Sequence, residues 1–151
     1  MGDFCFKGLF SGCTSLTTAP ELPATTLTKY CYNSMFSGCT SLVNAPELPA
    51  TVLRSSCYFG MFNGCTSLTT APELPATTIG YSSYEKMFLN CTSLNYIKAM
   101  FTKYQEYTKN WVSGVSSTGT FVMNAAAEWD PEDYRGINGI PAGWTVEKVT
   151  A

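Results

Sequence analysis

Seven cysteines and no histidine limit the chemistry that this chain of 151 residues can perform. Histidine usually activates a cysteine or serine nucleophile, and it is a ligand in most zinc sites. The chain also lacks the G-x-x-x-x-G-K-[ST] sequence that holds phosphate groups. We therefore predict that the protein is not an enzyme and that it holds neither a metal ion nor a cofactor.

Carboxylates form two groups that could attract a cation. Glu21, Glu47 and Glu73 recur at a constant spacing, and Glu128, Asp130, Glu132 and Asp133 lie within six residues. Neighbouring like charges repel one another or bind a positive ion, and calcium prefers oxygen ligands. For both groups we favour solvent-exposed carboxylates over a cation site. Prolines flank the first group and turn it toward solvent, and the second group lacks the spacing of an EF-hand loop.

Tyrosines and threonines give the stronger indication of a binding surface. The chain has nine tyrosines, and tyrosine on a rigid surface commonly recognises protein or glycan. Threonines recur at fixed positions where a sheet face would present them to a ligand. The candidate ligand-binding residues are Thr17, Thr69, Glu21, Glu47, Glu73, Tyr81, Tyr84 and Tyr96.

These residues are positioned by a sequence that recurs every 26 residues. GCTSLTTAPELPATT at 12–26 returns as GCTSLVNAPELPATV at 38–52 and as GCTSLTTAPELPATT at 64–78. A decayed fourth copy, NCTSLNYIKAMFTKY, occupies 90–104. Phenylalanines keep the same spacing, at Phe10, Phe36, Phe62 and Phe88. A fixed period of this size predicts a solenoid in which each repeat packs on its neighbours.

Each repeat divides into four parts: a strand, a proline-rich stretch, a short helix or pair of turns, and a residue that closes the turn. In the first copy Leu16–Ala19 is predicted to be a short strand that ends because Pro20 and Pro23 cannot donate to a ladder. The apolar stripe of Leu27, Cys31 and Met35 predicts a short helix or a pair of turns. A left-handed residue should follow it, because one column contains only Gly12, Gly38, Gly64 and Asn90.

The cysteines form two columns in such a stack. They are Cys5, Cys31 and Cys57 in one column, and Cys13, Cys39, Cys65 and Cys91 in the other. Equivalent positions on stacked strands lie about 4.8 Å apart, whereas a disulfide needs Cβ atoms about 3.8 Å apart. We therefore favour buried thiols that fill the core over a disulfide framework.

The pattern M-F-x-G-C-T-S-L-x-x-A-P-x-L-P resembles the BspA-like leucine-rich repeats of bacterial surface proteins. Residues 111–115, 119–121 and 139–146 are similar to the C-terminal cap of such proteins. The resemblance implies an α/β leucine-rich-repeat solenoid, a right-handed superhelix with short parallel strands. It also implies an exported cell-surface protein that binds a host protein or glycan. The alternative is a spacer domain with no ligand of its own.

The expected organisation is one domain with repeats over 1–101 and a capping region over 102–151. The copies lie near 4–29, 30–55, 56–81 and 82–101. In the last copy Lys98 and Phe101 replace prolines, so a longer strand is expected there. Further strands are predicted at 120–123 and 145–149, and a helical face through Tyr104, Tyr107 and Trp111 should begin the cap.

Charge and hydropathy exclude two classes of partner. The net charge of −2 and pI of about 5.0 give no basic surface for nucleic acid. No apolar run has the length of a membrane span. The chain also begins partway through a repeat, so we expect a longer parent protein. The uncapped first coil, with Phe4, Phe6, Leu9 and Phe10, is expected to self-associate at high concentration or to be disordered in the monomer.

Overall fold

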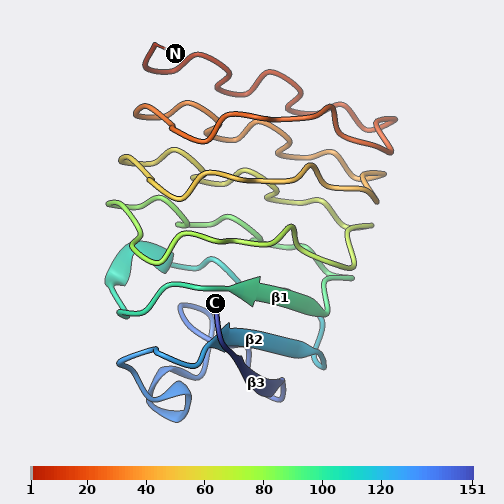
Figure 1. The fold of residues 1–151 in the computed structure, drawn as a ribbon. Helices are drawn as coiled ribbons and strands as arrows, with labels where there is room; N and C mark the ends of the chain where they lie inside the picture. The colour runs from red at the N-terminus through yellow and green to blue at the C-terminus, as the bar shows by residue number, and fades with distance from the viewer. Residues whose placement is uncertain (1) are drawn as a thin grey trace.

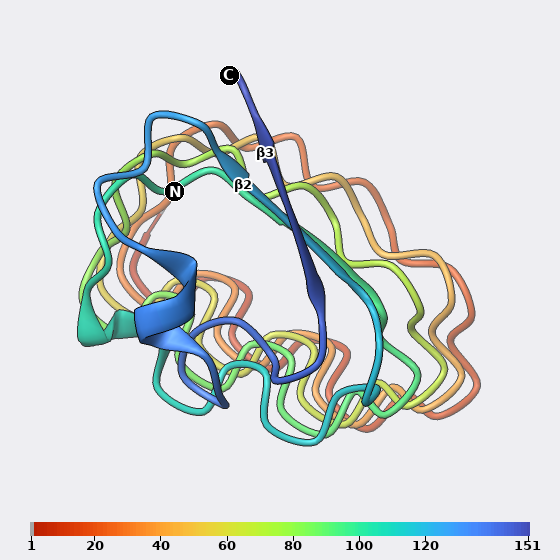
Figure 2. The ribbon, with the colours of Figure 1, turned by 90° about the horizontal axis from the view of Figure 1, so that it is seen from below.

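The computed structural model describes residues 2–151, which form a stack of coils running from one chain end to the other (Figure 1). Residues 26 apart lie side by side in successive coils. The Phe36 ring stacks on those of Phe10 and Phe62, with ring centroids 5.6 and 5.7 Å apart. Seen along the stack, the coils lie nearly over one another (Figure 2).

The predicted α/β class and leucine-rich-repeat superhelix are wrong. Residues 2–151 contain no α-helix, and their one sheet is open, with three short parallel strands in the order β1–β2–β3. These strands are β1 (Tyr96–Ala99), β2 (Thr120–Asn124) and β3 (Thr145–Val149). Tyr96 pairs with Thr120, which pairs in turn with Thr145. Two 3-10 helices, η1 (Glu106–Thr108) and η2 (Pro131–Tyr134), complete the regular elements.

Prolines account for the missing strands of the first three coils. The strand expected at Leu16–Ala19 is reduced to a single bridge between Thr18 and Asn44. Proline ends the ladder directly after it, because it has no N–H to donate. In the fourth coil, where Lys98 replaces the proline, β1 forms as predicted. The predicted strands at 120–123 and 145–149 are confirmed as β2 and β3.

The helix alternative also fails, in the turn segments, by which we mean residues 4–13, 30–39, 56–65 and 82–91. Every fourth residue there has a positive φ, as at Tyr30 (58°), Ser34 (54°) and Gly38 (75°). An α-helix needs consecutive residues with negative φ, so these segments form successive turns instead. The predicted left-handed column is confirmed, with φ of 75° at Gly12, Gly38 and Gly64 and 59° at Asn90.

Backbone amides of the turn segments alternate between two partners. Lys7 N–H donates to the Phe4 carbonyl of its own coil at 3.2 Å. Phe6 N–H donates instead to the Cys31 carbonyl of the next coil at 2.9 Å, and Phe10 N–H to that of Met35 at 2.9 Å. The same alternation continues through the second and third coils. Half of the bonding therefore closes the turns, and the other half joins each coil to its successor.

Columns of apolar side chains fill the space inside the coils. Phe36, Phe62 and Phe88 are fully buried, as are Leu42, Leu68 and Leu94 of the neighbouring column. Cysteines, methionines and tyrosines add parallel columns, namely Cys39, Cys65 and Cys91, then Met35, Met61 and Met87, and then Tyr32, Tyr58 and Tyr84. Phe10 of the first coil is only partly buried, because no other coil of residues 2–151 lies above it.

The C-terminal residues close the opposite end of the stack. Trp111, Phe121, Trp129 and Trp144 are all buried there. Asn138 supplies acceptors to the last coil: its Oδ1 accepts from Asn110 N–H at 2.6 Å, and its carbonyl accepts from Thr108 Oγ1 at 2.6 Å. The Trp111 indole donates to the Gly139 carbonyl at 2.8 Å. Of the helical face expected through Tyr104, Tyr107 and Trp111, only the three-residue η1 forms.

Candidate binding surface

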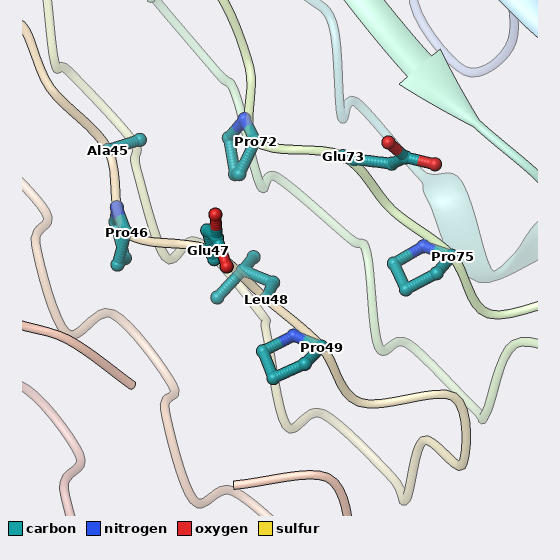
Figure 3. Close-up of a pocket in the computed structure, with 8 residues that line it drawn as sticks. All are labelled: Ala45, Pro46, Glu47, Leu48, Pro49, Pro72, Glu73 and Pro75. Atoms are coloured by element: carbon teal, nitrogen blue, oxygen red, sulfur yellow. The ribbon is translucent and has the colours of Figure 1, made fainter. Parts of the chain in front are cut away.

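A groove follows the A-P-E-L-P stretches down one side of the stack. We call it the proline–glutamate groove; it is lined by Ala19–Pro23, Ala45–Pro49, Pro72, Glu73 and Pro75. It consists of two adjoining hollows of about 440 and 420 Å³ that share Ala45, Pro46, Glu47 and Pro49. Figure 3 shows the hollow between the second and third coils, with prolines along both walls.

The prolines create the groove because they interrupt the bonding between coils. Within residues 2–151, the backbones of Glu21, Leu22, Glu47 and Leu48 form no hydrogen bond. One coil further on, Leu74 N–H donates to the Lys98 carbonyl at 3.0 Å, and Leu74 C=O accepts from Met100 N–H at 3.0 Å. The bonding resumes where the fourth coil has lost its prolines, so the groove ends there.

The three glutamates stand along this groove, as their spacing predicted. Glu21, Glu47 and Glu73 are exposed. Glu73 extends toward β1, where its Oε1 lies 2.9 Å from Lys98 Nζ, while Glu47 points another way (Figure 3). Because Glu73 has a cationic partner, the unpaired negative charge of the groove is concentrated at the first two coils. Sequence reasoning missed Lys98 as a partner; the available signal was its place in the 26-residue register, equivalent to Pro72, the residue next to Glu73.

The other predicted site residues lie in three different environments. Thr17 and Thr69 are exposed on the strip that precedes the groove in each coil. Tyr96 is half-buried in β1, and Tyr81 is 67% exposed with its ring edge-on to Tyr107 at 5.5 Å. These residues form no single site with the groove, although the threonines adjoin it.

Tyr84 is a correction to the predicted surface. Only 1% of it is exposed, because its ring stacks between Tyr58 and Trp111 with centroids 6.2 and 6.0 Å away. Burial raises the pKa of its hydroxyl, as it does for Tyr58, so both stay neutral at physiological pH. Tyr84 therefore belongs to the core and cannot contact a ligand.

The cysteines lie mainly inside the stack. The Sγ atoms of Cys5 and Cys31 lie 3.1 Å apart, well beyond the S–S bond length of about 2.05 Å. Cys65 and Cys91 donate through Sγ to the carbonyls of Phe36 and Phe62 at 3.2 and 3.0 Å. Burial raises the pKa of the Cys91 thiol to about 12, and likewise that of Cys57. Such thiols are poor nucleophiles at neutral pH.

The acidic turn is used for local structure. Asp130 Oδ1 accepts from Glu132 N–H at 2.9 Å at the start of η2. Glu132 pairs with Arg135 at 2.6 Å, and Glu128 with Lys103 at 3.5 Å. In the part of the chain that the structure describes, no three acidic, cysteine or histidine side chains gather as a metal ion would require.

Residues 2–151 also include no helix with the length and hydropathy of a membrane-spanning segment. No family model, curated protein or solved structure matches the chain.

Proposed function

We propose that the protein is a non-catalytic binding module and that its ligand occupies the proline–glutamate groove. The observation that carries this proposal is the run of unpartnered backbone groups at Glu21, Leu22, Glu47 and Leu48 beside exposed carboxylates. Proline fixes the backbone in this stretch, so little conformational entropy is lost when a ligand binds.

The chemistry of the groove favours an extended polypeptide with basic side chains. A peptide backbone carries both donors and acceptors, which match the unpartnered N–H and C=O groups of the groove. Lysine or arginine would be attracted to Glu21 and Glu47, whose charges no cation in residues 2–151 neutralises. The proline rings and Leu48 give apolar contact between these polar groups.

The setting we propose is the surface of a cell. The resemblance of the repeat pattern to BspA-like surface proteins supports export and adhesion to a host protein. Glycan recognition and a ligand-free spacer role are the alternatives to this proposal, and the same experiment separates them.

The experiment screens the full chain against arrayed matrix proteins and arrayed glycans. We expect hits among polypeptides rich in lysine and arginine. The double variant Glu21→Gln with Glu47→Gln should weaken them by about tenfold or more, because two carboxylates are lost without a change of shape. Glu147→Gln, on β3 at the far end, is the matched control and should leave them unchanged.

Three outcomes would contradict the proposal. Hits confined to glycans would show that the ligand is a glycan and not a polypeptide. The absence of any hit would favour the spacer role. Binding that is insensitive to the double variant would place the ligand outside the groove.

A further inference from the structure

A pocket separate from the proline–glutamate groove lies between η1 and the turn that follows η2. Its volume is about 470 Å³, and it is lined by Tyr104, Glu106, Lys109, Tyr134 and Asn138. Figure 2 shows η1, in teal, and η2, in blue, on the same side of the stack. The volume falls within the range of about 300–1,000 Å³ that is usual for small-molecule sites. We call this hollow the cap pocket.

Two tyrosine rings form an aromatic wall of the cap pocket. The rings of Tyr104 and Tyr134 stack with their centroids 3.8 Å apart, and the Trp129 ring lies 5.8 Å from each of them. The Tyr104 hydroxyl donates to the Asn138 carbonyl at 2.9 Å, which fixes the orientation of this ring. Trp129 is buried, whereas both tyrosines are only half-buried. The wall is therefore held in place before a ligand arrives and still has ring surface to offer.

The polar groups of the pocket have unused capacity for hydrogen bonding. Because Asn110 N–H is a donor, the amide oxygen of Asn138 must face it, which leaves Nδ2 on the other arm of the amide. Within residues 2–151 this Nδ2 and the Tyr134 hydroxyl form no hydrogen bond. The Glu106 carboxylate and the Lys109 ammonium are exposed, and neither forms an ion pair with a described residue. The pocket thus offers donors and acceptors side by side along an aromatic wall.

We propose that the cap pocket binds a neutral sugar unit of a glycan. A pyranose has an apolar C–H face, which would pack on the exposed tyrosine surface, and a rim of hydroxyls that each donate and accept. Those hydroxyls would donate to the Glu106 carboxylate and accept from the Lys109 ammonium and Asn138 Nδ2. The site lies outside the proline–glutamate groove, so this inference does not depend on the polypeptide ligand proposed there.

The charges of the pocket argue against other small ligands. A strongly anionic ligand would meet the like charge of Glu106, and a cationic ligand would meet that of Lys109. An apolar ligand would take these groups out of water without giving them partners. A small zwitterion would satisfy both charges, but it would leave the two tyrosine rings unused.

The test titrates the full chain with methyl glycosides of neutral hexoses and N-acetylhexosamines. Binding is followed by saturation-transfer NMR, which also reports which ligand protons touch the protein. Sodium acetate, methylammonium chloride and glycylglycine are the anionic, cationic and zwitterionic comparison ligands. The double variant Glu106→Ala with Lys109→Ala removes both charged groups and keeps the net charge. Glu147→Ala with Lys148→Ala, an exposed pair of opposite charges on β3, is the matched control.

We expect saturable binding of at least one glycoside, with the strongest transfer to the protons of its C–H face. The pocket variant should weaken this binding by at least about tenfold, and the control variant should leave it unchanged. The absence of saturation by every glycoside, or tighter binding of any comparison ligand, would overturn the proposal without reliance on a variant. Equal binding to the two double variants would also overturn it. So would loss of glycoside binding in Glu21→Gln with Glu47→Gln, which would place the sugar in the proline–glutamate groove.

Discussion

Replacing Phe62 by alanine should remove a large part of the stability of the whole stack. The Phe62 ring is fully buried between those of Phe36 and Phe88, with centroids 5.7 and 5.8 Å away. Truncation leaves a cavity that two coils share, and a buried phenylalanine-to-alanine change costs about 3–5 kcal/mol. A domain of this kind has a total of about 5–15 kcal/mol. The backbone bonds are kept, because alanine still donates its N–H to Met87.

Phe10→Ala provides the matched comparison in the same column. Its ring is only partly buried and stacks on Phe36 alone, so we expect a loss of about 1–2 kcal/mol. Urea unfolding measures both losses, with tyrosine circular dichroism reporting the coils. The fluorescence of Trp111, Trp129 and Trp144 reports the distant C-terminal end. Equal losses for the two variants, or less than about 1 kcal/mol for Phe62→Ala, would refute the stacked-column account.

Three further predictions follow from the backbone and the buried thiols. Gly38→Ala should lower the free energy of unfolding by about 1–2 kcal/mol because φ is +75° there. Gly38→Asn should lower it less, since Asn90 has the same left-handed conformation. Equal losses for the two variants in urea unfolding would contradict this. Asn138→Ala should cost about 0.5–1.5 kcal/mol through the lost acceptor for Asn110 N–H; an unchanged melting temperature would contradict it. Burial raises the pKa of Cys57 and Cys91 from 9.0 to about 12, so both stay protonated in the folded chain while the unfolded chain ionises. Stability should be complete below pH 9 and fall between pH 9 and 12, by about 1 kcal/mol per thiol at pH 10. Urea unfolding under reducing conditions that is constant to pH 10 would refute this.

The columns of the core could be predicted from the sequence because identical residues recur without insertion. Phe36, Phe62 and Phe88 had to lie in one line once the coils stacked, and the structure confirms it. Proline reasoning was equally secure, because a missing N–H removes a ladder bond in any fold. It predicted that the ladder stops at Pro20 and that a strand returns at β1, although only one bridge remains of the strand expected at Leu16–Ala19.

The conformation of the turn segments could not be predicted in the same way. Tyr30, Ser34, Ser56 and Lys86 have positive φ, although nothing in their side chains favours it. The hydrogen bonds between coils hold them there, and a residue in isolation carries no sign of such bonds. The prediction of the binding surface was wrong at Tyr84 for a related reason. Closely spaced tyrosines must face in different directions, and only the packing against Trp111 decides which of them turns inward.

The alternation of amides makes the pairing of coils sensitive to any odd change in the length of a turn segment. Inserting one residue into a turn segment would exchange the amides that close the turns with those that join that coil to its successor. Whole copies can therefore be gained or lost without disturbing the alternation, whereas a change of one residue inside a turn segment breaks it. The pairing of the fourth coil with the residues that follow it keeps the same alternation. Gly64 N–H reaches the carbonyl 25 positions on, at Leu89, while Asn90 N–H reaches the one 23 positions on, at Ser113. The spacing between paired residues has decreased by an even number, so the alternation of amides is unchanged.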